Sequence, residues 1–297
     1  MASCCWAENI LQLLRKMNNF YLPGSCRSSC FRFEIEGAQV GWIPPHVASL
    51  LARYPDVFSP PHQGAVTLCH GLDSYEKRSE AVSHVLQALR KEPSLTCLKG
   101  WRDEKYSVMP RFSDCPLMWM ERTATSLFGV KRYGVHINGY TVSDSQEVCM
   151  WLARRSHTKQ TYPGLLDNMA AGGLAAGVGI KHTLVKECQE EACVPAAIAK
   201  KARPVTLFTE ALEQCGFPLC LMFPLLFLSH LKVADMFSTF LMLAACKDIR
   251  RACSVCVLSL LCFDDYVTFK AKNVFAHKHT FRFDSAPVIS IPEVTKQ

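Results

Sequence analysis

The sequence lacks several features that would assign it to a particular class of protein. No run of five or six lysines and arginines is present, which argues against a nucleic-acid partner. No stretch of about 20 apolar residues runs unbroken, so we expect no membrane span. The first residues contain no basic segment followed by a long apolar core, which predicts a cytoplasmic protein, with an organelle as the alternative. Internal repeats and low-complexity tracts are also absent from the sequence.

The composition is that of a chain with a large buried core. Hydrophobic residues make up 49% and charged residues 20% of its 297 residues, which predicts a globular protein. The formal net charge of +7 comes from scattered basic residues. Such a surface would attract phosphorylated small molecules.

Cysteine is abundant, with 16 residues. Without a secretory signal we expect these thiols to be reduced. The residues that could bind zinc are Cys26 with Cys30 and Cys253 with Cys256, with His277 and His279 further on. Their spacing matches no common zinc module. Buried structural thiols are therefore the favoured interpretation, with zinc as the alternative.

The N-terminal part of the sequence mixes strand and helix patterns. Helical spacing of apolar residues predicts short helices over residues 10–20 and 46–54. Phe31, Phe33 and Ile35 alternate with charged residues, and a turn at Glu36-Gly37 follows, which together predict a β-hairpin. We assign residues 1–130 to an α+β domain.

A long amphipathic helix is predicted over residues 73–91. Asp73 or Ser74 can cap its first turn. Its apolar stripe consists of Val82, Val85, Leu86 and Leu89.

Further along, strands are predicted over residues 135–142 and 148–154. A glycine-rich loop and a helix from about Ile180 to Ala192 follow. Strand, glycine-rich loop and helix in this order indicate an α/β or α+β unit.

The chain changes character after residue 205. Between Cys215 and Cys262 only six residues are charged, and Leu, Phe, Met and Cys dominate. Prolines and charged residues interrupt the apolar runs, so we predict buried or interfacial helices rather than a membrane span. A peripheral membrane anchor is a weaker alternative.

Three glutamates carry the clearest chemical signal. Positions three and four apart share a helix face, so Glu187, Glu190 and Glu191 converge within an arc of about 100°. Crowded carboxylates either face open solvent or hold a cation, and hard oxygen ligands suit Mg²⁺ or Mn²⁺. A plain solvated face would explain the glutamates alone. Gly172 and Gly173 ahead of the helix favour a metal site, because backbone groups can approach closely there.

The stretch from Gly172 to Val194 resembles the Nudix box: Gly, five residues, Glu, seven residues, Arg-Glu-apolar-x-Glu-Glu-x-Gly-apolar. Gly172 fills the first position, Lys186 stands for the arginine, and the three glutamates fit in register. The departures are Val178, where the first glutamate is expected, and Cys193, where glycine is expected. The resemblance implies metal binding by Glu187, Glu190, Glu191 and the backbone carbonyl of Gly172 or Gly173. It also implies that Glu190 or Glu191 orients or deprotonates the attacking water.

The resemblance extends upstream. Residues 150–159 and 162–173 are similar to a Nudix subfamily related to thiamine pyrophosphokinase, which often lacks the first glutamate of the box. Residues 33–44 resemble part of an uncharacterised domain that precedes this Nudix unit. The resemblance implies hydrolysis of thiamine diphosphate, or of its oxo and oxy forms, to the monophosphate. Candidate phosphate contacts are Arg154, Arg155 and Lys159, which could equally be a strand end and a basic turn.

The expected architecture follows from this resemblance, which covers residues from about 10 to 204. It is an α+β chain: a smaller α+β domain over 1–130, then a Nudix-type α/β/α sandwich whose first half is 131–205. Residues 206–297 fit no part of that fold and resemble an alternative exon, which would leave the sandwich incomplete. Two functions therefore stay open: a metal-dependent diphosphate hydrolase, and a catalytically impaired isoform that acts as a binding or interaction protein. A homodimer is compatible with either.

Overall fold

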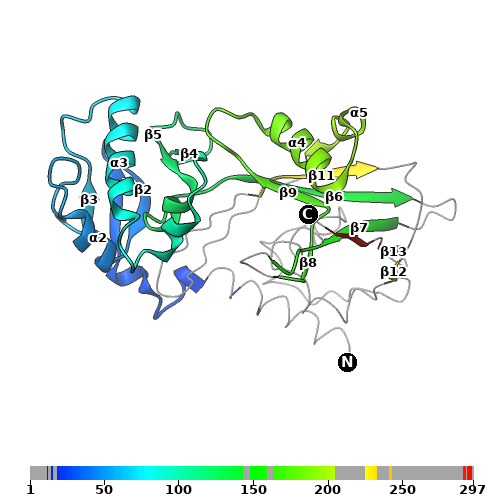
Figure 1. Cartoon of the computed structure of the whole chain (residues 1–297), viewed down its shortest axis with the longest axis horizontal. Helices are drawn as coiled ribbons and strands as arrows, with labels where there is room; N and C mark the ends of the chain where they lie inside the picture. The colour runs from blue at the N-terminus through cyan, green and yellow to red at the C-terminus, as the bar shows by residue number, and fades with distance from the viewer. Residues whose placement is uncertain are drawn as a thin grey trace, which may run out of the picture.

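The computed structural model describes residues 19–142, 148–158, 163–204, 225–232, 241–242, 290–291 and 293–295, together with Gln12 and Arg15. Over these residues the protein is a mixed α+β structure. Two groups of elements lie end to end along the long axis: residues up to about 130 form one, and residues from 134 onward form the other (Figure 1). The helix predicted over residues 10–20 falls for the most part outside the described residues.

A small three-stranded sheet forms the centre of the N-terminal unit. β1 (Phe31–Ile35) pairs antiparallel with β2 (Ala38–Ile43) and parallel with β3 (Ala65–Thr67). The predicted hairpin is confirmed, and its two turn residues, Glu36 and Gly37, have φ angles of 51° and 75°. Positive φ at both positions is what a two-residue turn between twisted antiparallel strands requires.

Two α-helices share a core with this sheet. α2 (Pro45–Leu51) begins with proline, whose missing N–H costs nothing in the first turn, and ends earlier than the predicted 46–54. α3 (Tyr75–Leu89) confirms the long amphipathic helix. Its cap is Ser74, whose hydroxyl oxygen accepts a hydrogen bond from the Lys77 backbone N–H at 3.2 Å. The predicted stripe is fully buried: Val82, Val85, Leu86 and Leu89.

A hairpin and short 3₁₀ turns complete the N-terminal unit. β4 (Lys105–Val108) pairs antiparallel with β5 (Met118–Glu121). The 3₁₀ turns are η1 (Asn19–Tyr21), η2 (Cys26–Ser29), η3 (Thr96–Gly100) and η4 (Arg122–Ser126).

A close backbone approach between two segments gives a test of this packing. The Trp42 N–H donates to the Phe128 carbonyl oxygen at 2.8 Å, and a Cβ at Gly41 would lie 2.2 Å from that same oxygen. Because this oxygen belongs to the backbone, it cannot move aside. We expect Gly41→Ala to lower the free energy of unfolding by about 3 kcal/mol in urea denaturation. Gly71→Ala is the control, since a Cβ at Gly71 would meet nothing within 4 Å. Equal midpoints for the two variants would contradict the prediction.

The second unit is organised around β6 (Gly134–Val142). One half of β6 pairs antiparallel with β9 (Ala170–Gly173), and the other half with β7 (Val148–Arg154). β7 continues beyond β6 to pair with β8 (Leu166–Asp167). The strands predicted over 135–142 and 148–154 are therefore confirmed.

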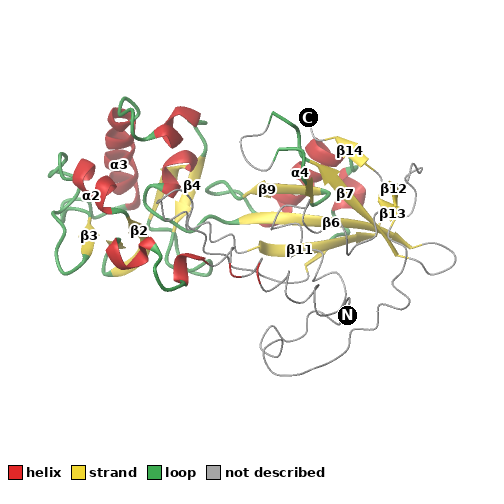
Figure 2. Ribbon diagram, turned by 90° about the horizontal axis from the view of Figure 1, so that it is seen from below, coloured by secondary structure: helices red, strands yellow, loops and turns green. Residues whose placement is uncertain are grey.

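α4 (Ile180–Ala192) lies over one face of this sheet and has the predicted bounds (Figure 2). It packs through Leu184, Cys188 and Ala192 into the same buried core as Val135 and Ile137 of β6. α5 (Ala196–Ala199) and β10 (Arg203–Pro204) follow.

The end of α4 explains one departure from the Nudix pattern. Cys193 occupies the glycine position of that pattern and has a φ of 52°, the left-handed conformation that glycine adopts without strain. The Val194 N–H donates to the Cys188 carbonyl at 3.0 Å, which closes the helix as such an end requires. The cysteine therefore preserves the shape of this helix end without the glycine.

The prediction of helices in the apolar tail is wrong for the residues described there. β11 (Leu225–Lys232) is a strand parallel to β6 and antiparallel to β10. β14 (Glu293–Thr295) pairs with β7, and β12 (Leu241–Met242) with β13 (Ser290–Ile291). A short apolar run fits a buried strand as well as a buried helix, and a free sheet edge decides between them. No helix in the described part of the chain is long and apolar enough to cross a membrane.

Two apolar cores correspond to the two units. The core of the N-terminal unit consists of buried residues between Phe33 and Val130. The core of the second unit consists of buried residues between Met109 and Ala199. Met109 precedes the predicted boundary at residue 130 but packs into the second core. The boundary stays a prediction, and the segment around Met109 connects the units.

Candidate functional site

The predicted glutamate face lies where α4 packs against β9. The side chain of Glu187 is only 14% exposed, and a Cβ at Gly172 would lie 2.0 Å from its carboxylate carbon. Only glycine at position 172 lets the carboxylate of Glu187 rest against the strand. One helical turn later, the Glu191 carboxylate accepts a hydrogen bond from the Ala171 N–H at 2.9 Å. Two of the three glutamates thus contact consecutive residues of β9.

Charge is crowded at this face. Burial, followed by the negative charge of Glu191, raises the pKa of Glu187 to about 7. Lys186 partly offsets the repulsion, with its Nζ 4.0 Å from a Glu187 oxygen and 3.6 Å from a Glu190 oxygen. Glu190 is 58% exposed and lies toward this lysine.

The donor set fits a hard divalent cation. Carboxylate oxygens from Glu187, Glu190 and Glu191 are the ligands that Mg²⁺ and Mn²⁺ prefer, and the missing Cβ at Gly172 lets the Glu187 carboxylate reach the strand. As the side chains stand, no three His, Cys, Asp or Glu residues of the described part surround one metal position. The backbone carbonyl oxygen of Gly172, the fourth predicted ligand, lies against Gly134 of β6. A Cβ added to Gly134 would be 3.0 Å from this oxygen.

Residues of the N-terminal unit stand beside this face, and the sequence interpretation missed them. The Tyr106 hydroxyl lies against Gly173, where a Cβ would meet it at 1.7 Å. Arg122 lies 5.5 Å from the Tyr106 ring centroid and donates to Glu104 at 2.7 Å. The negative charge of Glu187 acts on both Tyr106 and Arg122. A phenol and a guanidinium from outside the predicted Nudix unit therefore lie within electrostatic reach of Glu187.

Arg132, just before β6, belongs to the same group. Burial lowers its pKa to about 10, and the charges of Tyr106 and Arg122 act on it as well. An arginine with that pKa stays protonated at neutral pH, so two positive charges act on Tyr106, and one of them, that of Arg122, also acts on Glu187. No local motif marks Arg122 or Arg132 in the sequence, because they reach the site only through the packing of the two units.

The predicted phosphate contacts have other partners. An Arg154 guanidinium nitrogen donates to the Gly164 carbonyl at 3.0 Å. Arg155 forms an ion pair at 2.7 Å with Asp167, whose side chain is buried in β8. Lys159 lies outside the described residues. A phosphate role for Arg154, Arg155 and Lys159 stays a prediction, and the Arg155 contact fits the alternative of a structural strand end.

The zinc alternative gains no support from the cysteines described. The Cys30 thiol donates to the Cys26 sulfur at 3.9 Å, and both residues are half-buried. No further His, Cys, Asp or Glu of the described part joins them in a metal-binding group. Cys253, Cys256, His277 and His279 lie outside the described residues.

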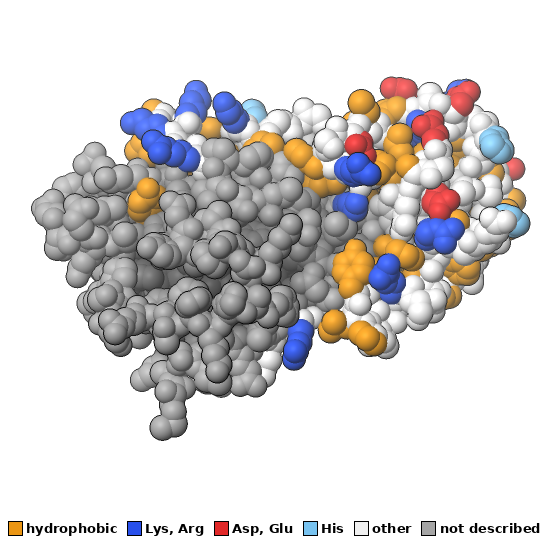
Figure 3. Space-filling view, turned by 180° about the vertical axis from the view of Figure 1, so that it is seen from behind, with side chains coloured by type: hydrophobic (Ala, Val, Ile, Leu, Met, Phe, Trp, Pro, Cys, Tyr) orange, Lys and Arg blue, Asp and Glu red, His pale blue; other side chains and the backbone are white. Residues whose placement is uncertain are grey.

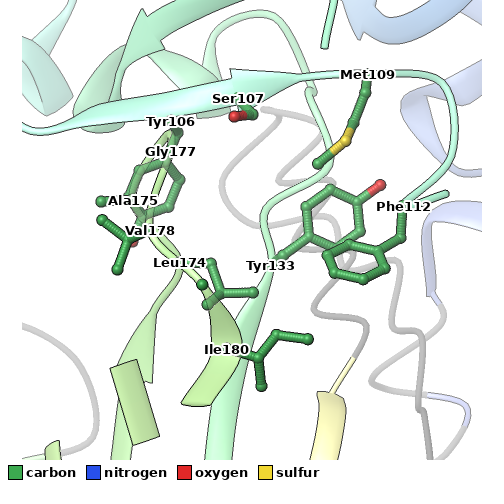
Figure 4. Close-up of a pocket in the computed structure, with 11 residues that line it drawn as sticks. Tyr106, Ser107, Met109, Phe112, Tyr133, Leu174, Ala175, Gly177, Val178 and Ile180 are labelled. Carbon is green, nitrogen blue, oxygen red and sulfur yellow. The ribbon is translucent and has the colours of Figure 1, made fainter. Parts of the chain in front are cut away.

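A cavity of about 310 Å³ lies between β4, Tyr133 and the loop from β9 to α4 (Figure 4). Its position at the start of α4 places it next to Gly172-Gly173. Val178, at the position of the missing box glutamate, lies on its wall and is 38% exposed. Most of the other lining residues are apolar or aromatic: Tyr106, Met109, Phe112, Tyr133, Leu174 and Ile180.

Basic side chains gather at one end of the molecule. On the face in Figure 3, acidic, basic and hydrophobic side chains are interspersed over the N-terminal unit, while Lys and Arg gather at the end that carries α4 and α5. The exposed basic residues following α5 include Lys200, Lys201 and Arg203. Positive potential at this end would attract an anionic ligand.

Comparison with known proteins links both units to other chains. Residues 9–132 match a family described as a domain of unknown function, DUF4743. The chain is 39% identical over 171 residues to Nudix hydrolase 24, chloroplastic, of Arabidopsis thaliana, a match that covers 57% of this chain and 46% of that protein. Nudix hydrolase 20, chloroplastic, of the same plant is 39% identical over 178 residues, with the same shares of each chain covered.

Two further likenesses are more limited. An uncharacterized protein of Saccharomyces cerevisiae is 40% identical over 121 residues, which cover 40% of this chain and 35% of that protein. The solved structure of DR0079 from Deinococcus radiodurans aligns at 20% identity with a TM-score of 0.32, over 45% of this chain and 74% of that one. The latter likeness is too weak to carry a conclusion about the fold. The chain spans less than half the length of each curated relative it matches.

Proposed function

We propose that this chain is a Nudix-type diphosphate hydrolase that uses Mg²⁺ or Mn²⁺ held by Glu187, Glu190 and Glu191. The observation that carries the proposal is the contact between Glu187 and Gly172, which brings the first glycine of the Nudix-like stretch against one of its three glutamates. The two Arabidopsis relatives named as Nudix hydrolases support the same class of reaction. The α/β/α sandwich is part of this proposal, and α4 over one face of the sheet fits it.

Each group of the site has a role in this reaction. When bound, the metal would supply positive charge to the diphosphate and lower the pKa of a water molecule. One Glu191 oxygen accepts a hydrogen bond from the Ala171 N–H, which fixes this carboxylate at the strand, where it would accept a proton from the attacking water. The water oxygen bonds to phosphorus as the anhydride P–O bond breaks, and a monophosphate and a phosphate leave. Arg122 and Arg132 would bind phosphate oxygens and stabilise the charge that develops there.

The proposed substrates are thiamine diphosphate and its oxidised oxo and oxy forms. The support for them is the subfamily resemblance of residues 150–173, together with the site for a small diphosphate beside a ring-sized cavity. A cytoplasmic location and a homodimer belong to the same set of proposals.

Metal removal tests the proposed reaction. The full chain with Mg²⁺ is incubated with thiamine diphosphate, its oxidised forms and nucleoside diphosphate derivatives, and phosphate release is measured. We expect release to cease with EDTA and to return when Mg²⁺ or Mn²⁺ is added in excess, because the carboxylates alone cannot neutralise a diphosphate. Unchanged turnover in EDTA would contradict the metal requirement, and absence of turnover on every substrate would contradict the hydrolase.

The second candidate is a catalytically impaired protein that binds a ligand or partner. The orientation of Glu190 favours it, because this carboxylate lies toward Lys186 rather than with the other two around one point. Electron paramagnetic resonance of added Mn²⁺ separates the candidates. Free Mn²⁺ signal at every protein concentration would favour the impaired protein, and loss of that signal on binding would favour the hydrolase.

A further inference from the structure

The cavity described above is formed by both units of the chain. β4 and the loop after it contribute Tyr106, Met109 and Phe112 from within the region that matches the domain of unknown function. The other wall is the loop from β9 to α4. The Ala176 N–H donates to the Lys105 carbonyl at 2.7 Å, so the loop is hydrogen-bonded directly to β4. The N-terminal unit therefore forms one side of the space at the start of α4.

The lining favours a flat, apolar ligand. Phe112 and Tyr133 stand with ring centroids 5.0 Å apart and planes at 54°, and Figure 4 shows them side by side at one end of the cavity. Met109, Leu174 and Ile180 add polarizable or aliphatic surface. Aromatic and methionine side chains are the groups on which planar rings pack well. No lining residue is charged, and Val178 places an apolar side chain where the Nudix pattern has a carboxylate.

One polar atom in this wall is left without a partner. Tyr133 is only 5% exposed, and its hydroxyl has no hydrogen-bond partner among the described residues. Burial raises the pKa of Tyr133 to about 12, so the hydroxyl keeps its proton and can donate it. A buried donor without an acceptor is costly, which makes this position receptive to an acceptor on a ligand.

The size and position of the cavity limit what it can hold. Ligand cavities in proteins run from roughly 300 to 1,000 Å³, so about 310 Å³ suits one heterocyclic moiety and not a dinucleotide. Tyr106 lines the cavity and touches Gly173, and the preceding residue, Gly172, touches Glu187. A ring in the cavity would therefore have its diphosphate within reach of the glutamate face.

We infer that this cavity binds the planar heteroaromatic ring of the diphosphate substrate, with the Tyr133 hydroxyl donating to an acceptor on the ring edge. The N-terminal unit is then a substrate-recognition element, through Met109 and Phe112. That a ring binds here rests on the cavity alone. That the ring carries a diphosphate rests on the proposed function.

Product binding tests the inference without turnover. The probes are thiamine monophosphate and cytidine monophosphate, which carry a heteroaromatic ring, and inorganic phosphate, which does not. Dissociation constants are measured on the full chain by calorimetry or ligand-observed NMR. We expect Tyr133→Phe and Phe112→Ala each to weaken binding of at least one ring-bearing probe about tenfold. The first variant loses one hydrogen bond to the ring, and the second loses one ring contact. Binding of inorganic phosphate should not change.

Two controls separate recognition from a general loss of structure. Tyr75→Phe removes a hydroxyl and Leu22→Ala removes an exposed apolar side chain, both away from the cavity lining. Neither should alter any dissociation constant. Ring-bearing probes that bind all variants with the affinity of the unmodified chain would overturn the inference, and so would failure of both ring-bearing probes to bind. Ring binding that follows the expected pattern in a chain without turnover would support the inference while contradicting the proposed hydrolase.

Discussion

Replacement of Glu191 by glutamine is expected to lower kcat about 1,000-fold, the effect of removing a base from the reacting centre. The amide oxygen of glutamine can still accept the hydrogen bond that the Ala171 N–H donates to Glu191 at 2.9 Å. The hydrogen bond between α4 and β9 therefore survives, while the negative charge, the basicity and the carboxylate ligand proposed for the metal are lost. Far-ultraviolet circular dichroism and the thermal midpoint should stay close to those of the unmodified chain.

The matched control for this variant is Gln189→Ala on the same helix. Gln189 is exposed, two positions before Glu191, and no role in the site is assigned to it. We expect its kcat to stay within about twofold, since an exposed polar side chain on a helix contributes little. A Glu191→Gln variant with the turnover of Gln189→Ala would show that the Glu191 carboxylate takes no part in the reaction.

The second large effect is expected from Gly172→Ala. The new Cβ would lie 2.0 Å from the Glu187 carboxylate carbon, so the carboxylate must move. Displacement of a catalytic group by about 1 Å can cost about 100-fold in rate, and we expect a loss of that size in kcat/KM. Stability should change little, because the displaced atoms form the end of a flexible side chain.

Gly71→Ala is the control for this prediction. Gly71 lies outside the cavity lining, and a Cβ there would meet nothing within 4 Å. The two variants add the same methyl group, but only one of them reaches Glu187. If Gly172→Ala kept full turnover and full Mn²⁺ affinity, Glu187 would not need its present position and the metal assignment would lose its main support.

Most of the regular elements could be predicted from local patterns. The hairpin at Glu36-Gly37, α3 and α4 each depend on residues close together in the chain. A turn with positive φ, a serine cap and an apolar stripe act within one element, so they leave a readable pattern. The three glutamates belong to the same group, because the helical repeat alone places them on one face.

The apolar tail shows where local patterns fail. Residues 225–232 are predicted as helix and form a strand beside β6. Leucine and phenylalanine pack equally well in a buried helix and a buried strand, so the choice depends on the unpaired edge of a sheet built elsewhere in the chain.

The sequence by itself determined α4, its three glutamates and the glycines that precede them, because helix periodicity and chain spacing act over short distances. Only the tertiary structure decided that Glu187 rests on Gly172, that the charge of Arg122 reaches Glu187, and that Tyr133 faces a ring-sized cavity. These neighbours come from different units, and their approach depends on how β4, β6 and α4 pack. Packing across units leaves no periodic trace in the order of residues, so the substrate wall of the site emerges only once the chain is folded.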